Sequence, residues 1–317
     1  MKILITGVAG FIGYSLASKF LENKHTIFGI DNFDDYYSVK IKKKRISLLK
    51  RKKNFYFNKI DITNFRKIKN FFSKKKIDII IHLAAQAGVR YSIINPNKYL
   101  DVNINGFLNL VRAIENKQIK KFIYASSSSV YGDSKKFPLK ENNILRPKNI
   151  YGLSKKINEQ IADHYDKIYK TKFIGLRFFT IYGEWGRPDM FMLKLFKSSI
   201  EDKIFYLNNF GKHLRDFTYI GDVINIIGKL LKKNIKKHDV YNICSNKPLN
   251  IYDIVKNFRE ENSLKLKLIK LNKADVLNTH GDNNKIKKFV NYKKFANFRE
   301  SFKKTFKWYV LNKINRY

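Results

Sequence analysis

The order of structural signals in residues 1–31 restricts the possible folds more strongly than any other part of the chain. Residues 2–6 read as a short apolar strand, and a turn with glycines at positions 7, 10 and 13 follows. Apolar residues then recur at helical spacing, and a second strand signal over residues 25–30 ends at Asp31. Strand, glycine-rich turn, helix, strand and terminal acid form the sequence context of a dinucleotide-binding unit.

Each part of this unit has a task at a dinucleotide. Glycines let the backbone approach a pyrophosphate, and a helix N-terminus supplies amide donors and partial positive charge. Asp31 can accept hydrogen bonds from ribose hydroxyls, and its carboxylate repels a 2′-phosphate, so NAD is predicted rather than NADP. A purely structural turn would leave Asp31 unexplained. The turn residues predicted to contact NAD are Gly7, Gly10, Phe11, Ile12 and Gly13.

Strand and helix signals continue to alternate up to about residue 180. Strand signals at residues 55–60, 77–83, 121–125 and 173–179 are separated by helix signals, among them a long one over residues 96–116. Repeated strand–helix units predict an α/β fold with a doubly wound parallel sheet of the Rossmann type. The strand ends add predicted NAD contacts at Asn32, Asp61, Ile62, Leu83, Ala84, Ala85 and Phe178.

The alternation of strand and helix signals stops after residue 180, where residues 183–190 are predicted to form a loop rich in turn residues. We predict that residues 1–180 form the NAD-binding domain, with residues 221–246 and a closing helix over 295–312 packing on it. Residues 181–220 and 247–290 are predicted to form a smaller C-terminal substrate-binding lobe.

The chain is strongly basic, with a formal net charge of +39. Such a charge can indicate binding to nucleic acid or to an anionic membrane. The lysines are spread along the chain and no nucleic-acid-binding signature accompanies them, so compositional drift is the preferred explanation. The densest basic run, residues 40–53, contains spaced apolar residues and predicts a helix with a solvated face.

The single cysteine, Cys244, excludes an intramolecular disulfide and fits a reducing compartment. It lies in an apolar run, so a buried thiol is predicted. No apolar run is long enough to span a bilayer, and the chain starts with a strand rather than a signal peptide. We therefore expect a soluble cytoplasmic protein, and we predict no metal site.

Tyr151 and Lys155 are spaced so that a helix would place them one turn apart on the same face. A nearby ammonium lowers a tyrosine pKa, which would make Tyr151 a general base near neutral pH. The spacing alone does not select this pair, since a surface tyrosine and lysine is the default for any one pair. The same spacing occurs at Tyr36/Lys40, Tyr131/Lys135, Tyr252/Lys256 and Tyr309/Lys313.

Several motifs together resemble extended short-chain dehydrogenases/reductases. The glycine turn, the serine run 126–129 before Val130-Tyr131-Gly132, and Tyr151-x-x-x-Lys155 follow that family's order and approximate spacing. Three strings closely resemble UDP-glucuronate 4-epimerases: AAQAGVRYS at 84–92, LRFFTIYGEWGRPDM at 176–190 and RDFTYI at 215–220. The resemblance covers essentially the whole chain.

The resemblance selects Tyr151 and Lys155 from the five pairs. It implies that Tyr151 is the base, that Lys155 holds the nicotinamide ribose and lowers the tyrosine pKa, and that Ser127 hydrogen-bonds the reacting hydroxyl. NAD would take a hydride from C4 of a UDP-sugar and return it to the other face of the 4-keto sugar, remaining bound as a prosthetic group. The family also commonly forms homodimers, here through the helix over 96–116 and the one that carries Tyr151.

With UDP-glucuronate, the 4-keto intermediate is a β-keto acid, which can lose carbon dioxide if its carboxylate is badly aligned. The resemblance implies that serine and threonine hydroxyls hold this carboxylate, with Arg187 nearby. For the serines, a small-residue strand end packed on the cofactor is the alternative. Arg215 resembles the diphosphate-binding arginine, and Arg90 is a weaker candidate. The predicted substrate contacts are Arg90, Ser127, Ser128, Ser129, Thr180, Arg187, Arg215 and Asp275.

Three positions depart from the family pattern. Glu184 replaces a usual proline, Gly221 stands where the first aspartate of a pair is common, and Ala274 replaces a glycine. Glu184 lies close to the substrate loop, where added negative charge could weaken binding of an acidic sugar.

The sequence leaves other functions open. A 4,6-dehydratase needs an acid pair where this chain has Ser128 and Ser129, and hydroxyls cannot do that work at neutral pH. A 4-epimerase for UDP-glucose or UDP-N-acetylglucosamine and a UDP-glucuronate decarboxylase are the enzymatic alternatives. A non-catalytic NAD-binding protein that acts through its basic surface is the non-enzyme alternative, against which the intact Tyr151, Lys155 and Ser127 set argues.

Overall fold

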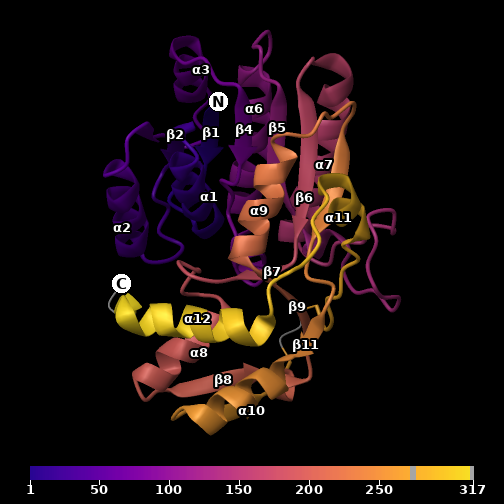
Figure 1. The fold of residues 1–317 in the computed structure, drawn as a ribbon. Helices are drawn as coiled ribbons and strands as arrows, with labels where there is room; N and C mark the ends of the chain where they lie inside the picture. The colour runs from indigo at the N-terminus through magenta and orange to yellow at the C-terminus, as the bar shows by residue number, and fades with distance from the viewer. Residues whose placement is uncertain (272–275, 315–317) are drawn as a thin grey trace.

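The computed structural model describes residues 1–271 and 276–314, which form an α/β domain and a smaller lobe (Figure 1). The lobe lies at the end of the sheet where the strands finish (Figure 1). A cavity lined by residues of both parts lies between them. Among the described residues, none of the helices combines the length and apolarity needed to cross a membrane.

The main sheet is parallel throughout, as the sequence predicts. In the described residues it has seven strands in the order β10-β6-β5-β4-β1-β2-β3. The chain runs outward from β1 to β3 and then returns to place β4 on the other side of β1. The loops after β1 and β4 therefore diverge and open a crevice at the carboxyl ends of the strands. The strands are β1 (Lys2–Thr6), β2 (Thr26–Asp31), β3 (Phe55–Lys59), β4 (Ile79–His82), β5 (Lys121–Ser127), β6 (Lys172–Phe178) and β10 (Asp239–Ile243).

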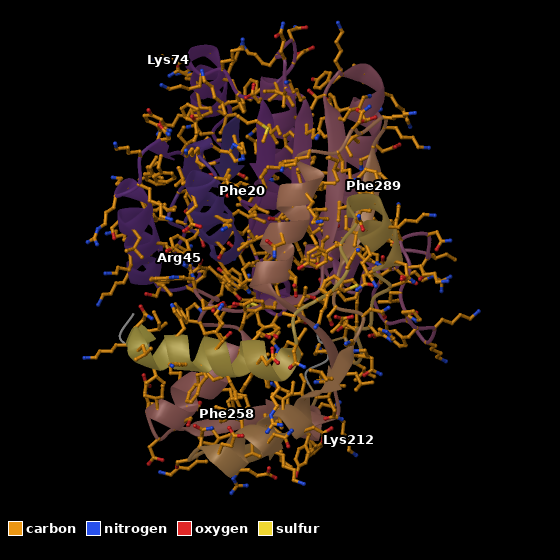
Figure 2. All side chains as sticks on the ribbon, in the orientation of Figure 1. Phe20, Arg45, Lys74, Lys212, Phe258 and Phe289 are labelled. Atoms are coloured by element: carbon orange, nitrogen blue, oxygen red, sulfur yellow. The ribbon has the colours of Figure 1, made fainter. Side chains whose placement is uncertain are left out.

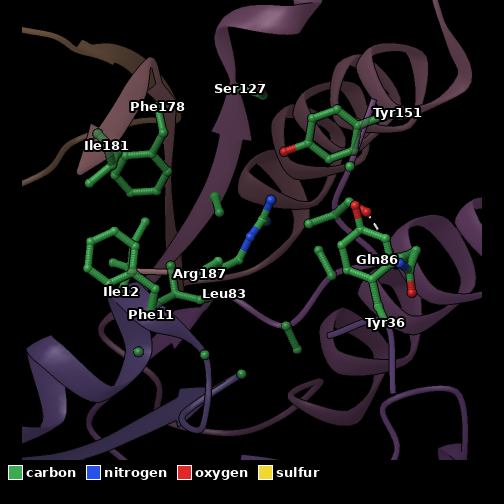
Figure 3. Close-up of a pocket in the computed structure, with 18 of the residues that line it drawn as sticks. Phe11, Ile12, Tyr36, Leu83, Gln86, Ser127, Tyr151, Phe178, Ile181 and Arg187 are labelled. Carbon is green, nitrogen blue, oxygen red and sulfur yellow. Dashed lines mark hydrogen bonds between the residues drawn. The ribbon is translucent and has the colours of Figure 1, made fainter. Parts of the chain in front are cut away.

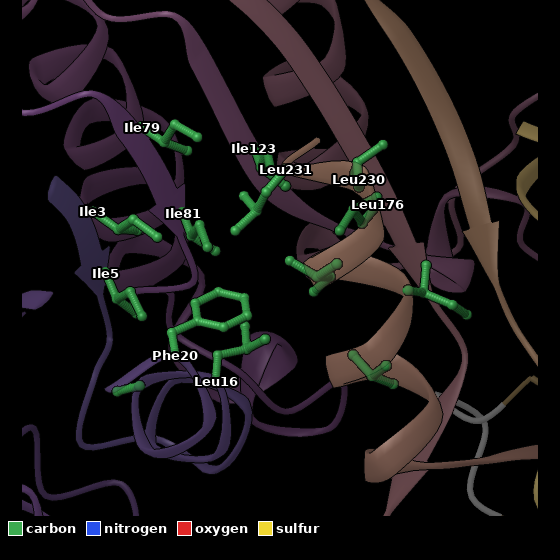
Figure 4. Close-up of a cluster of buried hydrophobic side chains, with 14 of the residues drawn as sticks. Ile3, Ile5, Leu16, Phe20, Ile79, Ile81, Ile123, Leu176, Leu230 and Leu231 are labelled. Carbon is green, nitrogen blue, oxygen red and sulfur yellow. The ribbon is translucent and has the colours of Figure 1, made fainter. Parts of the chain in front are cut away.

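Helices cover both faces of this sheet because successive strand residues point to opposite sides. Ile3 and Ile5 of β1 belong to the core on one face, where Phe20 of the first helix packs (Figure 4), whereas Leu4 belongs to the core on the other. The first face carries α1 (Phe11–Glu22), α9 (Ile220–Leu230) and α11 (Asn284–Val290), and the second carries α3 (Phe65–Lys74), α6 (Gly106–Ala113) and α7 (Ile150–Ile168).

The single long helix predicted over residues 96–116 is interrupted. Before α6 lie α5 (Pro96–Tyr99) and a π-helical segment (Leu100–Asn105), whose wider turn accommodates a buried Asn103. The Asn103 side chain accepts from the Gln86 amide at 2.7 Å and donates to the Ser154 hydroxyl at 3.0 Å. The interruption thus ties the loop after β4 to α7.

The lobe has its own aromatic core, and the C-terminal helix α12 (Phe298–Leu311) belongs to it. Phe302 and Phe306 pack against Phe196 and Phe258, with ring centroids between 5.0 and 5.9 Å apart. The prediction that this helix packs on the NAD-binding domain is therefore wrong, because its phenylalanine stripe finds aromatic partners in the lobe. The lobe also contains β7 (Thr180–Tyr182), α8 (Phe191–Ile200), β8 (Ile204–Asn208), β9 (Leu214–Tyr219), β11 (Pro248–Asn250), α10 (Ile251–Glu261) and β12 (Lys265–Ile269).

The basic run after β2 forms the predicted helix, α2 (Val39–Lys50), but its face is not fully solvated. Lys42 is 6% exposed and Arg45 is 0% exposed, because both donate hydrogen bonds to backbone carbonyls. Figure 2 shows Arg45 between the sheet and the lobe, while Lys74 points outward from the far end of the domain. The remaining short elements are α4 (Tyr91–Ile94) and the 3-10 turns η2 (Ser128–Val130) and η3 (Asn209–Gly211).

Candidate active site

A cavity of about 490 Å³ lies between the carboxyl ends of the strands and the lobe. In Figure 3 the Tyr151 hydroxyl and the Arg187 guanidinium point into it, with Ile12 and Phe178 on one side. Most of the site residues predicted from the sequence line this cavity: Gly7, Gly10, Phe11, Ile12, Gly13, Asp31, Asn32, Ile62, Leu83, Ala84, Ala85, Ser127, Ser128, Ser129, Tyr151, Lys155, Phe178, Thr180, Arg187 and Arg215.

Three predicted site residues are not found at the cavity. Asp61 is not part of the lining, but it accepts a hydrogen bond at 2.8 Å from the side chain of Asn32, which is. Arg90 is exposed at the start of α4 and is not part of the cavity wall. Asp275 lies outside the described residues.

The glycine turn packs so closely that side chains cannot replace its glycines. Gly7 has φ +69°, and a Cβ there would lie 2.7 Å from the backbone nitrogen of Ala84. A Cβ on Gly13 would lie 2.3 Å from the Gly7 carbonyl oxygen. The turn and the loop after β4 therefore form a bare-backbone wall at the N-terminus of α1, which suits a pyrophosphate.

Asp31 completes this wall at the end of β2. Its carboxylate accepts from the Ala9 amide at 3.0 Å and from the Phe33 amide at 2.8 Å, and burial raises its pKa. Each carboxylate oxygen keeps a further lone pair for a hydroxyl donor. The turn, helix end and acid thus fit the dinucleotide predicted from the sequence.

Tyr151 and Lys155 lie in the first turns of α7, whose N-cap Asn149 accepts from the Gly152 amide at 2.9 Å. Lys155 is 2% exposed, and burial lowers its pKa to about 8. Within the described part of the chain its ammonium has no hydrogen-bond or ion-pair partner, although it reaches the cavity. A buried cation of this kind suits a ligand hydroxyl.

The pKa of Tyr151 differs from the expectation. Burial raises it, and a hydrogen bond with Ser127 and the positive charge of Arg187 oppose that rise. The predicted lowering by Lys155 is not found, because desolvation outweighs the opposing contributions and these come from other residues.

The strand end that carries the serines is anchored from behind. Ser126 donates to the Glu159 carboxylate at 2.5 Å, and Arg177 forms a buried ion pair with Glu159 at 2.7 Å. These contacts tie β5 and β6 to α7. In front of them, the Ser127 hydroxyl donates to Ser129 at 3.2 Å, so the serines face the cavity as one group.

Arg187 already has a carboxylate partner within its own loop. Its Nε and Nη2 donate to Asp189 at 3.0 and 2.9 Å, and the Tyr36 hydroxyl donates to the same carboxylate at 3.3 Å. The Arg187 side chain is 23% exposed and lines the cavity. Arg187 therefore offers an oriented cation whose charge is partly balanced.

The departure at Glu184 is compensated by two lobe residues. The Tyr219 hydroxyl donates to the Glu184 carboxylate at 2.9 and 2.8 Å, and Lys304 of α12 pairs with it at 3.3 Å. A Cβ at Gly221 would lie 2.7 Å from the Tyr219 ring, so the departure at Gly221 gives that ring its room. Glu184 therefore faces its lobe partners rather than standing as an unpaired charge.

Arg215 of β9 lies on the lobe side of the cavity. Its guanidinium donates to the carbonyl oxygens of Leu277 at 2.6 Å and Val276 at 2.5 Å. These carbonyl contacts hold the guanidinium against residues 276–277.

Several cavity residues were not predicted from the sequence. The signal for some of them was present, because Tyr36, Tyr37 and Lys42 follow soon after the end of β2 at the same sheet edge as the glycine turn. Others gave no signal of their own. The missed residues include Tyr36, Tyr37, Lys42, Gln86, Ile181, Met190 and Thr279.

Of the other predictions from the sequence, some agree with the structure and some do not. Cys244 is buried as predicted. His82 at the end of β4 is buried as well, and burial lowers its pKa to about 3. The surface prediction fits Tyr252, which is 41% exposed, but it is wrong for the buried Tyr131 and Tyr309. No cluster of three or more His, Cys, Asp or Glu side chains is placed to hold a metal ion among the residues described.

Comparison with known proteins agrees with this geometry. A UDP-glucuronate 4-epimerase of Thermodesulfobacterium geofontis is 38% identical over 311 residues, covering 96% of this chain and 95% of its own. The crystal structure of UDP-glucuronic acid 4-epimerase from Bacillus cereus, with UDP-glucuronic acid and NAD, has a TM-score of 0.92 at 31% identity, covering 98% of this chain and all of the other. A UDP-glucose 4-epimerase from Thermotoga maritima has a TM-score of 0.89 at 25% identity, with 98% and 99% coverage.

The model of the NAD dependent epimerase/dehydratase family matches residues 3–244. That span contains the glycine turn, the serine strand end, Tyr151, Lys155 and Arg187. The chain belongs to the NAD dependent epimerase/dehydratase family.

Proposed function

We propose that this protein is an NAD-dependent 4-epimerase that interconverts UDP-glucuronate and UDP-galacturonate. The observation that carries the proposal is the shared cavity in which Tyr151 and Arg187 face each other beside the glycine turn. One residue suits a proton transfer and the other suits an acidic sugar. The similarity to UDP-glucuronate 4-epimerases over nearly the whole chain supports the same substrate.

The residues of the glycine turn, Asp31 and Lys155 would hold the NAD. Its pyrophosphate fits the bare backbone at Gly7 and Gly13, and the hydroxyls of its riboses fit Asp31 and Lys155. When bound, NAD supplies a reversible hydride acceptor for C4 of the sugar.

Tyr151 takes the proton of the sugar 4-hydroxyl in this mechanism and later returns it. Because burial raises the pKa of Tyr151, the phenolate depends on the groups that oppose burial, which are the Ser127 hydroxyl and Arg187. Ser127 also orients the hydroxyl that reacts. The lowered pKa of Lys155, about 8, lets that side chain accept or share a proton near neutral pH.

Arg187 and the hydroxyls of Ser128, Ser129 and Thr180 hold the sugar carboxylate. They keep the bond to the carboxyl carbon out of line with the 4-keto group, which suppresses loss of carbon dioxide. Hydroxyls can rotate, so they can serve the carboxylate in more than one sugar orientation. Arg215 meets the diphosphate from the lobe side.

Two enzymatic alternatives remain and one experiment separates them. A 4-epimerase of UDP-glucose or UDP-N-acetylglucosamine is supported by the fold shared with the Thermotoga maritima enzyme, and a decarboxylase would share the keto intermediate. Purified protein is incubated with UDP-glucuronate and the products are separated by chromatography. UDP-galacturonate is the expected product. A UDP-pentose indicates decarboxylation, and turnover of neutral UDP-sugars alone overturns the proposal.

Arg187→Ala is expected to weaken turnover of UDP-glucuronate about tenfold or more, since charge-assisted pairs to a carboxylate contribute about 1.5–3 kcal/mol. Released carbon dioxide should rise in the same variant. Turnover of any neutral UDP-sugar should change less. An unchanged preference between acidic and neutral sugars would make Arg187 structural.

We further propose a cytoplasmic homodimer formed through α5, the π-helical segment, α6 and α7. Leu100 and Leu153 of these elements are 41% and 38% exposed, which gives such an interface apolar contacts. Light scattering of the purified protein tests this.

The basic surface is proposed to have no nucleic-acid partner, which a salt-dependent binding assay checks.

A further inference from the structure

Arg45 is a fully buried cation for which the proposed mechanism has no task. Its Nη1 donates to the Ala9 carbonyl at 2.8 Å and to the Tyr37 hydroxyl at 3.0 Å. Its Nη2 donates to the carbonyls of Trp185 at 2.6 Å and Gly186 at 3.1 Å. A buried guanidinium is costly unless such bonds satisfy it, so its place between these groups requires an explanation.

On the cofactor side, Arg45 fixes one peptide of the glycine turn. The Ala9 amide donates to Asp31 at 3.0 Å while its carbonyl accepts from Arg45. The backbone on both sides of Ala9 is thus held by charged side chains from β2 and α2. Any tilt of the turn would break one of these bonds.

On the substrate side, Arg45 fixes the two residues that precede Arg187. The carbonyls of Trp185 and Gly186 both accept from Nη2, 140 positions or more along the chain. A planar guanidinium can satisfy acceptors in two directions at once, whereas a lysine ammonium on a flexible stem cannot hold the same fork.

We propose that Arg45 is a positioning residue that locks the loop carrying Arg187 to the glycine turn and so sets the preference for an acidic sugar. The proposal rests on the proposed function. Arg45 acts through Arg187 and the turn and does not touch the sugar. Its removal should therefore weaken contacts made by Arg187 and leave contacts made by the lobe, such as those of Arg215, unchanged.

The loop that Arg45 contacts contains a tryptophan whose fluorescence can be measured. The chain has two tryptophans, Trp185 and Trp308, and their ring centroids lie 5.3 Å apart. Trp185 also packs edge-on against Tyr14 of α1, at 5.2 Å. Intrinsic tryptophan fluorescence therefore reports on the loop that Arg45 holds, independently of turnover.

The test compares Arg45→Met and Arg45→Lys with the wild type. Arg51→Met, an exposed position at the C-terminus of the same helix, is the matched control. Affinities for UDP-glucuronate and for UDP alone are measured by calorimetry, after wild-type turnover has tested the function itself. Both Arg45 variants should lose about tenfold in affinity for UDP-glucuronate, or about 1.4 kcal/mol, and about twofold or less for UDP. Their tryptophan emission should shift, while the control resembles the wild type.

A double-mutant cycle with Arg187→Ala distinguishes positioning from general support of the fold. In the Arg187→Ala background, Arg45→Lys should cost about twofold or less in UDP-glucuronate affinity. An equal loss in both backgrounds, an equal loss for UDP alone, or no loss at all overturns the proposal. If Arg45→Met does not fold, Arg45→Lys carries the test, because it keeps the charge and the apolar stem. Failure of wild-type turnover overturns the proposed function instead.

Discussion

The two sides of the cavity are held by different means. On the cofactor side, backbone geometry sets the positions of the cavity residues. Gly7 has a positive φ, Gly13 is closely packed, and a helix spaces Tyr151 from Lys155. On the substrate side, long side chains from distant segments hold one loop. Arg45 reaches it from α2, and Lys304 reaches it from α12.

This difference explains which side tolerates change. A side chain added to the glycine turn meets backbone that cannot move, whereas a new residue in the substrate loop can find a new partner. Glu184, which the resemblance marked as a departure from the family pattern, is accommodated by Tyr219 and Lys304. We therefore expect substitutions on the cofactor side to be poorly tolerated and substitutions in the substrate loop to be accommodated.

The largest effect should come from Tyr151→Phe. Loss of the proton acceptor should reduce turnover about 10³-fold, within the range of general acid–base catalysis, while NAD stays bound. Tyr252→Phe is the matched control, since that tyrosine has the same spacing to a lysine but is 41% exposed. Steady-state kinetics and NAD content after denaturation measure both. A rate near that of the wild type would remove Tyr151 from the chemistry.

Lys155 should make folding stability depend on pH. Its folded pKa is about 8 against 10.5 in the unfolded chain, so the unfolded state binds more protons between these values. Stability of the wild type relative to Lys155→Met should rise by about 3 kcal/mol as pH goes from 8 to 10.5. Urea unfolding of NAD-free protein tests this, with Lys167→Met on the same helix as control. A flat difference would mean that Lys155 is hydrated when folded.

Gly13→Ala should destabilise the fold by about 2 kcal/mol, because overpacking against fixed backbone costs about 1–3 kcal/mol. Gly228→Ala in α9 is the control. A Cβ there meets only Phe20 at 3.7 Å, so that change should be neutral or stabilising by up to about 1 kcal/mol. Equal thermal unfolding of the two variants would show that the glycine turn tolerates a side chain as well as an uncrowded helix position does.

The smallest effect is expected from Glu184→Gln. Its partners are partly exposed, so stability should fall by about 1 kcal/mol or less, and salt should reduce the difference. Because Lys304 balances the charge, affinity for UDP-glucuronate should stay within about twofold. A marked gain in affinity would indicate that the carboxylate repels the sugar after all. Exposed Glu260→Gln is the control.

The fold and the cofactor side of the cavity could be predicted from patterns among residues that lie close together in the sequence. The glycine turn with Asp31 and the alternating strand signals predict the parallel sheet because backbone conformation follows from nearby residues. Tyr151 and Lys155 needed the family resemblance, since spacing alone left five pairs. The interruption at Asn103 was missed because its partners, Gln86 and Ser154, come from other elements.

The sequence by itself determined the doubly wound sheet, the place of the glycine turn and the residue types that meet at the sheet edge. Only the tertiary structure decided that Arg45 is buried rather than solvated, that α12 belongs to the lobe and that Glu184 is balanced by Lys304. The physical reason is the separation along the chain between the residues that interact. Hydrogen-bonded strands and helices repeat over a few residues, whereas the charge and burial of one side chain depend on segments that only folding brings together.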